Sequence, residues 1–404
     1  MQKVAIIAPN SLPIPPIRGG GIQYVINEVV PLYKEFKPYV FSNCEYGIDN
    51  LPLKETSGEV EHRRICQSSW DEFKINLRHL STLNYFPYVF EIIKQIKEEK
   101  PDVIEVMNRP WFLPILRKYL GPDVKIILHH FNNYLMEMSK SRAKKYLDLV
   151  DGFVGCSNFT VEAEVLSRFP EYKNKCYSIS HGIDTNIFDP DKLNQSTQAK
   201  LRGKYGLKKD DVVLLYIGRL SKDKGAGQFL EAAKVLISNI GMRHVKMMIV
   251  GSSFFGGETK VTPFMKELQT SAEEVKDNII FTGFINRPDI PDIYGLANIV
   301  VVPSIVMDAS PSVCYEAASM SLPIIASKRG GIPEIVKDNE TGLLVNDPED
   351  IDELAEKMLY FVKNPDEAKA FGKRGRQLMA KHYTWEMVAG KIEDTYKKVL
   401  KGRK

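Results

Sequence analysis

The chain has 404 residues, of which 44% are hydrophobic and 26% charged, a composition typical of folded globular proteins. This length exceeds what one hydrophobic core accommodates and predicts two domains of roughly 200 residues each. The 55 basic and 51 acidic residues give a net charge of +4, which excludes the strong positive field of a typical nucleic-acid-binding protein. No apolar run reaches the ~18 residues of a membrane span, and Pro9 stops the first run too early for a signal peptide.

The five cysteines are odd in number and widely spaced, and no CxxC pair occurs among Cys44, Cys66, Cys156, Cys176 and Cys314. This pattern is typical of free thiols in a reducing compartment, and it favours neither a disulfide framework nor a zinc site. We therefore expect a cytoplasmic protein with free thiols.

In the first half of the chain, apolar runs of strand length alternate with helical patterns. Strands are predicted at residues 4–8, 103–106, 125–128 and 152–155. Helices are predicted after the glycines at 19–21, where apolar residues recur at helical spacing up to residue 30, and over 85–100. Strands that alternate with helices predict a parallel sheet covered on both faces.

The same pattern restarts in the second half of the chain, beyond a polar joining segment near residues 185–208. Strands are predicted at residues 212–217, 245–250, 279–282, 299–302 and 324–326, and a helix at 226–238. Two α/β units in series follow from this restart.

The loop at residues 218–225, GRLSKDKG, follows a predicted strand and precedes a predicted helix. Ligands of open α/β sheets bind beyond the carboxyl ends of the strands. The guanidinium of Arg219 and the ammonium of Lys224 suit phosphate oxygens, so together they could neutralise a diphosphate. The alternative is that both are solvated charges in a turn.

Two carboxylates, Asp308 and Glu316, stand on either side of another predicted helix start, and the segment that contains them ends in the diglycine 330–331. Asp308 would lie in the loop, where it could meet a sugar. Glu316 would lie in the second helical turn, within reach of ribose hydroxyls. The alternative interpretation is a turn residue and a helix-start charge that favours the helix dipole.

The predicted start of that helix is itself an anion site. Ser310 is a candidate N-cap, and Pro311 fits the first helical position. The backbone amides of Ser312 and Val313 would then be available to an anion.

Two further features of the first unit could contact a ligand. Gly20 and Gly21 open a helix and would let a phosphate or sugar approach the backbone closely, although most such pairs mark only a tight turn. His129 and His130 end a predicted strand. An exposed histidine there could donate to a sugar hydroxyl or to a developing charge, and the alternative is a packed or capping histidine. The sequence does not distinguish which of the two would face a ligand.

These motifs together resemble a retaining glycosyltransferase of the GT-B fold, in the family numbered four. The matching stretches span nearly the whole chain: the loop at Gly20-Gly21, KPDVIEV at Lys100, SNFTVEAEV after Cys156, HGIDTNIF at His181, YIGRLSKDKG at Tyr216, FTGFINRPDIPDIYGLANIVVVPS at Phe281, the carboxylate pair, Gly330-Gly331 with Glu334, and Tyr383-Thr384-Trp385-Glu386. RGGGIQ at Arg18 and MNRPW at Met107 are also similar to a branch of the family associated with spore coats.

The resemblance implies two Rossmann-like domains whose parallel sheets face a central cleft. We expect an acceptor-binding domain over residues 1–190 and a nucleotide-sugar-binding domain over 205–375. A C-terminal helix, within 376–404, would cross back to pack on the first domain.

The resemblance also implies a role for each candidate residue. Arg219 and Lys224 would bind the donor diphosphate, and Asp308 stands where the family has a glutamate that contacts the donor sugar. The remaining donor-binding positions are Gly20 and Gly21, Gly218, the base-pocket residues Gly283, Phe284 and Ile285, the amides of Ser312 and Val313, and the ribose-binding Glu316. His129 or His130 would lie over the transferred sugar.

We therefore expect a retaining hexosyltransferase that needs no metal and no cofactor. Its donor would be a nucleoside-diphosphate sugar, with uridine as the base on family grounds. Its acceptor would be a sugar, a lipid-linked sugar or a small molecule, and a peripheral contact with membrane or spore coat is compatible with the basic residues near the C-terminus. The alternative is a non-catalytic structural or nucleotide-sugar-binding protein, such as a spore coat component.

Overall fold

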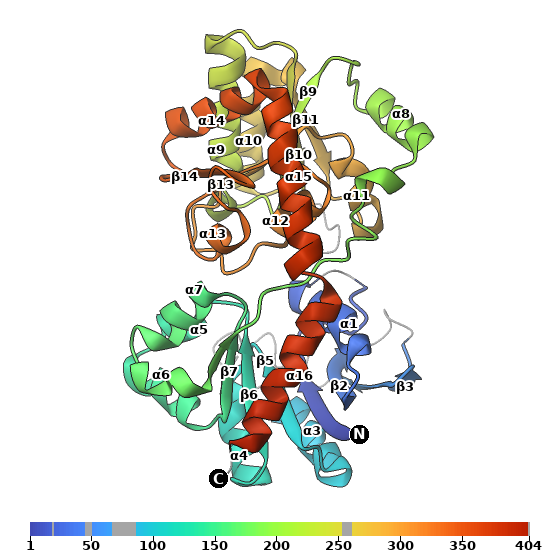
Figure 1. The fold of residues 1–404 in the computed structure, drawn as a ribbon, viewed down its shortest axis with the longest axis vertical. Helices are drawn as coiled ribbons and strands as arrows, with labels where there is room; N and C mark the ends of the chain where they lie inside the picture. Colours follow the sequence, from blue (N-terminus) through green and yellow to red (C-terminus); the bar gives the residue numbers. More distant parts are fainter. Residues whose placement is uncertain (18–19, 45–50, 67–85, 253–260, 403–404) are drawn as a thin grey trace. The chain divides into compact units, whose positions relative to one another are not determined.

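A computed structural model describes residues 1–17, 20–44, 51–66, 86–252 and 261–402 (Figure 1). Arg18 and Gly19 of the RGGGIQ motif, and Tyr85 at the start of one predicted helix, lie outside the described residues. The chain forms two compact units: unit 1 is Met1–Gly182 together with Trp385–Lys404, and unit 2 is Ile183–Thr384. The chain therefore completes unit 1 only after it has passed through unit 2.

Among the described residues, the sheet of unit 1 has eight strands in the order β3-β4-β2-β1-β5-β6-β7-β8, and each neighbouring pair except β3 with β4 is parallel. The strands are β1 (Gln2–Ile7), β2 (Phe36–Cys44), β3 (Lys54–Ser57), β4 (Val60–Cys66), β5 (Val103–Met107), β6 (Lys125–His130), β7 (Gly152–Gly155) and β8 (Cys176–Ser178). Most side chains of β1, β5, β6 and β7 are buried, as parallel strands covered on both faces require.

The helices of unit 1 are α1 (Gly21–Val29), α3 (Phe86–Glu99), α4 (Leu113–Leu120), α5 (Tyr134–Glu137), α6 (Lys140–Asp148), α7 (Asn158–Val161) and α16 (Trp385–Lys401). In α16, residues at helical spacing from Trp385 to Val399 are buried, and the helix packs on α1 and on the short 3₁₀ turn Val30–Leu32 that follows it. Figure 1 shows α16 running across the strands of this unit.

The sheet of unit 2 has six parallel strands in the order β11-β10-β9-β12-β13-β14 in the described part of the chain. They are β9 (Val212–Ile217), β10 (Val245–Val250), β11 (Ile279–Gly283), β12 (Ile299–Val302), β13 (Ile324–Ser327) and β14 (Gly342–Val345). The helices are α8 (Gln195–Lys204), α9 (Ala226–Lys234), α10 (Pro263–Ala272), α11 (Ile290–Tyr294), α12 (Ser312–Ser319), α13 (Ile332–Ile335), α14 (Ile351–Lys363) and α15 (Pro365–His382).

In both sheets, the order in which strands are added reverses next to the first strand. In unit 1 the chain runs outward from β1 through β2 and then restarts on the other side of β1 with β5. In unit 2 it runs outward from β9 through β10 and β11 and restarts on the other side of β9 with β12. Ligands of open parallel sheets bind at such a switch point, beyond the carboxyl ends of the two strands. The topology therefore predicts ligand-binding residues after β1 and β5 in unit 1, and after β9 and β12 in unit 2.

The structure places the ends of the units differently from the predicted boundaries. The predicted terminal segment, 376–404, contains the last turns of α15, which belongs to unit 2, and then α16, which belongs to unit 1. The two helices separate at Tyr383, whose carbonyl oxygen accepts the amide of Ile183 at 2.7 Å. In the polar segment near 185–208, the structure has the helix α8, whose N-cap is Asn194.

The prediction that all five cysteines are free is wrong for two of them. Cys44 and Cys66 end the neighbouring parallel strands β2 and β4, are partners in the strand register and form a disulfide across a Cα–Cα distance of 4.8 Å. Their spacing of 22 residues along the chain gives no sign of this pairing, because the register of two strands brings them together. Cys156, Cys176 and Cys314 are free thiols.

Candidate functional site

The loop at residues 218–225 of unit 2 is tied to the strand ends around it. The amide of Gly218 donates to Val250 at the end of β10, and the amide of Leu220 donates to Ser252 beyond it, each at 3.0 Å. Gly251 has φ +139°, and a Cβ there would collide with the carbonyl of Gly218. The close approach of these two loops therefore needs glycine at residue 251.

The same loop is fastened to the segment that follows β12. Gly225 adopts the left-handed conformation with φ +79°, and a Cβ there would collide with the carbonyl of Pro303. The carbonyl of Asp223 accepts the amides of Ile305 and Val306 at 3.0 and 3.3 Å. The loops after β9 and β12, the two strands at the switch point, are thus held against each other.

Lys224 and Asp308 meet at this junction. Lys224 Nζ lies 2.5 Å from Asp308 Oδ2, and the two side chains are 28% and 16% exposed. The carbonyl of Asp308 accepts the amide of Gly331 at 2.8 Å. Gly330 has φ +60°, and any side chain there would collide with the backbone of Asp308. The structure therefore brings Lys224, Asp308 and the diglycine 330–331 together, as the sequence predicted for a single site.

Arg219 lies on the same loop but is more exposed. Its Nη2 is 3.2 Å from Asp223 Oδ2, and its side chain is 45% exposed. Burial opposes ionisation of Asp223, but the neighbouring Ser221 side chain and the charges of Arg219 and Lys224 outweigh it and hold the pKa of Asp223 below its ordinary value. Each of the two predicted phosphate-binding cations thus has a carboxylate partner within the loops, and an anionic ligand would compete for both.

The start of α12 differs from the prediction by one residue. The helix begins at Ser312, and Pro311 precedes it without a side-chain cap. Ser310 is not the N-cap, because its hydroxyl pairs with the hydroxyl of Tyr315 at 2.9 Å. The amides of Ser312 and Val313 still belong to the first helical turn, which has no helical acceptors for them. The N-terminus of α12 therefore keeps the anion-binding character that was predicted for it.

Glu316 is 3% exposed, and both of its carboxylate oxygens already have partners. Arg287 Nη1 donates to Oε1 and the Tyr294 hydroxyl donates to Oε2, each at 2.9 Å. Burial, followed by the negative charge of Glu316, raises the pKa of Tyr294 well above its ordinary value, so this phenol stays a donor. Ribose hydroxyls would reach Glu316 only by sharing its oxygens with Arg287 or displacing it.

The predicted base-pocket residues follow the end of β11. Gly283 has φ +74° with open space around it, and its carbonyl accepts the amide of Gly251 at 3.0 Å. Phe284 is 39% exposed, and Ile285 packs partly buried against the hydrophobic core. Arg287, the partner of Glu316, lies two residues after Ile285. The base-pocket segment is therefore close in sequence to a residue that contacts Glu316.

In unit 1, Gly20 and Gly21 form the start of α1. Gly20 has φ +107° and lies against the Gln23 side chain, while Gly21 faces open space. The amide of Tyr24 donates to Gly20 at 2.9 Å. The prediction of a helix that opens on a glycine is confirmed.

His129 and His130 end β6. Neither has the exposure that was expected of a ligand-facing histidine. His129 is 2% exposed and His130 is 0% exposed. His129 Nδ1 lies 2.8 Å from Glu105 Oε1, and the ring stacks on Phe131 with 4.4 Å between centroids. Its Nε2 has no hydrogen-bond partner among the described residues.

His130 lies beside a second buried carboxylate. Its Nδ1 is 3.2 Å from Glu164 Oε2, but the geometry is not that of a hydrogen bond, and the same oxygen accepts the Leu135 amide at 2.6 Å. Sequence reasoning missed Glu105, Glu164 and Arg287. The signal for Glu105 was its charge within the apolar strand VIEVM, because a carboxylate in a buried strand needs a partner.

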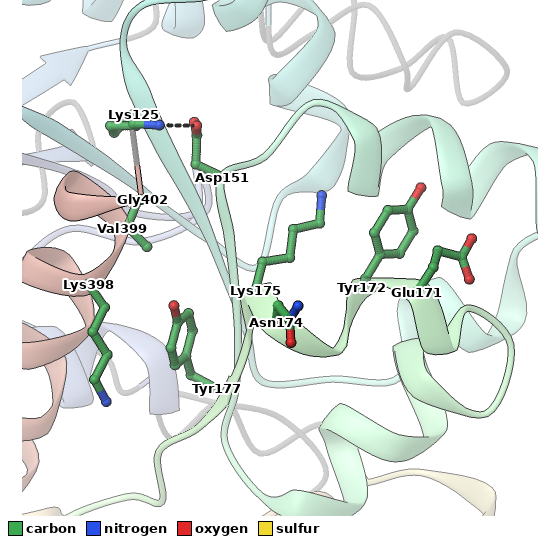
Figure 2. Close-up of a pocket in the computed structure, with 10 residues that line it drawn as sticks. All are labelled: Lys125, Asp151, Glu171, Tyr172, Asn174, Lys175, Tyr177, Lys398, Val399 and Gly402. Atoms are coloured by element: carbon green, nitrogen blue, oxygen red, sulfur yellow. Dashed lines mark hydrogen bonds and ion pairs between the residues drawn. The ribbon is translucent and has the colours of Figure 1, made fainter. Parts of the chain in front are cut away.

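A surface cavity of about 470 Å³ lies elsewhere in unit 1 (Figure 2). It is lined by Lys125, Asp151, Glu171, Tyr172, Asn174, Lys175, Tyr177, Lys398, Val399 and Gly402. Asp151 accepts Lys125 Nζ at 2.7 Å, the Ile126 amide at 3.0 Å and Arg117 Nη2 at 3.1 Å. Lys125 begins β6, so this cavity is at the amino end of that strand, and none of the predicted site residues lines it.

The described residues contain no group of three or more histidine, cysteine, aspartate or glutamate side chains that could hold a metal ion. Within the same residues, no helix has both the length and the apolar character to cross a membrane.

The architecture of two α/β units with parallel sheets is the GT-B fold of glycosyltransferases. The crystal structure of Anabaena HepE in complex with UDP and glucose matches it with a TM-score of 0.73 at 17% sequence identity, covering 98% of this chain and 100% of that one. At this identity the likeness establishes the fold, and the predicted fold class is confirmed.

The sequence comparisons identify the class of protein. Residues 197–378 match the family described as Glycosyl transferases group 1. Spore coat protein SA of Bacillus subtilis is 28% identical over 402 residues, covering 98% of this chain and 100% of that protein. The putative glycosyltransferase YtcC of the same organism is 26% identical over 403 residues, covering 99% and 93%. The chain carries a glycosyl transferases group 1 domain, and the resemblance predicted from its motifs is confirmed.

Proposed function

We propose that this protein transfers a hexosyl group from a nucleoside-diphosphate sugar to an acceptor hydroxyl, with retention at the anomeric carbon and without a metal ion. The observation that carries the proposal is the Lys224–Asp308 pair at 2.5 Å. It lies at the switch point of unit 2, between glycine-dependent loops and in the same segment as the N-terminus of α12. A cation, a carboxylate and free amides at one strand-end junction suit a ligand that has both phosphates and sugar hydroxyls.

In this proposal the donor rearranges the ion pairs of the free protein. The diphosphate replaces Asp308 as the partner of Lys224 and Asp223 as the partner of Arg219. The amides of Ser312 and Val313 bind one phosphate. Asp308, released from Lys224, accepts hydrogen bonds from the donor sugar.

The remaining contacts of the donor extend from this junction. Glu316 binds the ribose once Arg287 shares or leaves it, and Gly218, Gly283, Phe284 and Ile285 surround the base. On unit 1, Gly20 and Gly21 approach the donor or acceptor, and His129 binds the transferred sugar. Between the two histidines we choose His129, because its Nδ1 is held by Glu105, whereas neither ring nitrogen of His130 has a hydrogen-bond partner among the described residues.

The proposed step exchanges one bond for another. The bond between the anomeric carbon and the diphosphate oxygen breaks, and its electron pair leaves with the phosphate. The acceptor oxygen attacks the same face of the sugar, and its proton passes to the leaving phosphate oxygen. Lys224, Arg219 and the helix N-terminus stabilise the charge that develops on the diphosphate, and no side chain acts as nucleophile.

We propose uridine as the base of the donor. The support is the solved HepE structure, which shares the fold and holds UDP and glucose. The acceptor is a hydroxyl of a sugar, of a lipid-linked sugar or of a small molecule. We also propose peripheral contact with a membrane or spore coat, supported by the basic residues near the C-terminus. The free-thiol argument for a reducing compartment does not hold, because Cys44 and Cys66 form a disulfide.

A thermal-shift and calorimetric screen of UDP, GDP and ADP sugars tests the donor site. We expect one base to stabilise the parent protein and Lys224→Ala to weaken its binding by about 10- to 100-fold, because a charge-assisted hydrogen bond contributes about 1.5–3 kcal/mol. Lys222→Ala is the matched control. Lys222 lies in the same 3₁₀ turn, Lys222–Lys224, but is 73% exposed and pairs with Glu267 at 3.5 Å. Equal donor affinity in parent and Lys224→Ala would contradict the phosphate assignment.

A second candidate function is non-catalytic binding or a structural role. The observations that favour it are the full-length similarity to spore coat protein SA and the engagement of both Glu316 oxygens by Arg287 and Tyr294. Slow hydrolysis of the donor separates the two candidates. A parent protein that binds a nucleotide sugar but neither transfers nor hydrolyses it would support the non-catalytic role, and a product with the donor's anomeric configuration would support ours.

A further inference from the structure

A chain of buried polar side chains in unit 1 connects the C-terminal helix to His129. Tyr396 on α16 donates its hydroxyl proton to Glu105 Oε2 at 2.6 Å. The hydroxyls of Tyr396 and Tyr33 are 3.1 Å apart, and His129 Nδ1 lies 2.8 Å from the other oxygen of Glu105. Tyr33 is 6% exposed and the other three residues at most 2%. Little water therefore reaches these four side chains, and the orientation of each depends on its hydrogen bonds to the others.

The strand that carries Glu105 explains why the carboxylate meets α16. Ile104 and Val106 on β5 belong to the core cluster that also contains residues of α3 and α4. Successive side chains of a strand point to opposite faces, so Glu105 points to the other face. A buried carboxylate is costly, and an apolar residue would fill the same space with equal or greater stability. The presence of a glutamate at this position therefore indicates a task beyond packing.

The hydrogen bonds among these four side chains all lead toward Glu105. Burial, followed by the charge of Glu105, raises the pKa values of Tyr33 and Tyr396 well above the ordinary value, so both phenols keep their protons. Because Tyr396 donates to Glu105, Tyr33 must donate to Tyr396. An ionised carboxylate only accepts, so His129 donates from Nδ1. The remaining ring nitrogen, Nε2, is buried and has no hydrogen-bond partner among the described residues.

We propose that Glu105 is a positioning residue for His129, and that Tyr396 holds Glu105, so that the C-terminal helix belongs to the sugar-transfer apparatus of unit 1. This inference rests on the proposed function, in which His129 binds the transferred sugar. Glu105 fixes the tautomer of His129, while stacking on Phe131 limits rotation of the ring.

The other titratable groups around His129 define the controls. On the next residue of β6, His130 faces Glu164. Across Phe131 lies His181, with 5.5 Å between the Phe131 and His181 rings. On α16, Glu393 accepts the amides of Lys34, Glu35 and Phe36. Glu393 thus anchors the same helix as Tyr396 but does not contact Glu105 or His129.

The first test reads the His129 ring directly, by ¹⁵N NMR of the full-length chain labelled at histidine, with His129→Asn to assign the signal. We expect Nδ1 of His129 to carry a proton throughout the neutral pH range. In Glu105→Gln, we expect the single Nδ1-protonated tautomer to give way to a mixture, because an amide side chain can present either a donor or an acceptor to the ring. Glu393→Gln and Glu164→Gln should leave the His129 tautomer as it is in the parent.

The second test separates binding from turnover, with the UDP sugar that stabilises the parent as donor. We expect Glu105→Gln to lower kcat about tenfold or more with an unchanged Kd for UDP. Tyr396→Phe should also lower kcat, but by a smaller factor. Glu393→Gln should reduce only the thermal stability. An unprotonated Nδ1 in the parent, a His129 tautomer that is unchanged in Glu105→Gln, or an unchanged kcat in that variant would each overturn the inference.

Failure of the inference and failure of the proposed function give different results. A parent that turns over its donor as fast as Glu105→Gln does would refute the positioning role alone. A parent that turns over no donor would refute the proposed function, and the positioning role with it, whatever the state of the His129 ring.

Discussion

The two units present polar groups at the carboxyl ends of their strands in opposite ways. In unit 2, Lys224, Asp308 and Arg219 are between 16% and 45% exposed, and glycine-rich loops hold them. In unit 1, His129 and Glu105 are almost completely buried, and a helix from the far end of the chain holds them. The first arrangement leaves ion pairs that a charged ligand can exchange, whereas the second fixes a single ring against a buried charge.

The difference shows two ways to prepare a site. A phosphate site must give up its internal partners when the ligand arrives, and partial exposure makes the exchange inexpensive because surface ion pairs are weak. A histidine that must keep one tautomer benefits from a partner that water cannot reach. Four variants would break or sharpen this comparison.

Asp308→Ala should have the largest effect. With Lys224 left free, we expect UDP to bind at least as well as to the parent, while kcat for sugar transfer falls about 100-fold, because a misplaced donor sugar costs that much. Steady-state kinetics with separate nucleotide titrations provide the measurement. Asp366→Ala is the control, since Asp366 is 98% exposed and pairs only with Lys369. Unchanged sugar transfer in Asp308→Ala would show that Asp308 is only a turn residue.

Glu393→Ala tests how far unit 1 depends on its C-terminal helix. The change removes one carboxylate oxygen that accepts three amides, at 2.9, 2.7 and 3.1 Å, and we expect a loss of about 2 kcal/mol. Urea unfolding followed by tryptophan fluorescence reports on this unit, because Trp111 and Trp385 belong to its described part and Trp70, outside the described residues, falls within its range. Glu386→Ala, at an exposed position of α16, should leave the transition unchanged.

Gly283→Ala tests the glycine loops of unit 2. Gly283 has φ +74° and nothing within 4 Å of the added Cβ, so the expected cost of about 1 kcal/mol comes from the left-handed backbone alone. Gly203→Ala, in α8 with equally open space, should instead stabilise by about 0.5 kcal/mol. Differential scanning calorimetry of both variants measures the two signs, and destabilisation by both would contradict the backbone explanation.

Asp151→Asn should have the smallest effect, and it depends on pH. Burial opposes ionisation of Asp151, but Lys125, the Ile126 amide and Arg117 outweigh it and lower its pKa. A lowered pKa stabilises the folded state fully above the unfolded value, about 3.9, and this stabilisation is lost as the pH falls through the folded value. We expect the variant to be less stable than the parent by about 1 kcal/mol at pH 7, with the difference shrinking below pH 4. A difference that stays constant with pH would contradict this account.

The parts of the fold that the sequence predicted are those with local signals. The apolar runs at 212–217 and 245–250 coincide with β9 and β10, because buried parallel strands consist almost entirely of branched apolar residues. β4 was missed because it contains Glu61, Arg63 and Arg64. Arg63 is only 5% exposed, and its Nη2 pairs with Glu61 and Glu99. A strand whose buried charges are neutralised by neighbouring carboxylates has no apolar signature.

The candidate site residues also fall into those with a local sequence signal and those without one. Lys224, Asp308 and the diglycine 330–331 were predicted together because they lie in loops at consecutive strand ends, and those ends meet at one edge of a parallel sheet. Glu105 and Tyr396, which are 291 residues apart, were not linked, because nothing in the local sequence of either residue specifies the other. The disulfide of Cys44 with Cys66 was missed for the same reason, since it depends on the register of β2 with β4.

The division of unit 1 into two stretches of sequence has a consequence for its synthesis. Residues of α16 leave the ribosome only after all of unit 2 has been made, and translation proceeds at about 5–20 residues per second. Until then Glu105 has no Tyr396, and the amides of Lys34, Glu35 and Phe36 have no Glu393. Part of the sheet of the nascent first unit therefore stays uncovered while the second unit is completed, and α16, which is translated after unit 2, then covers it.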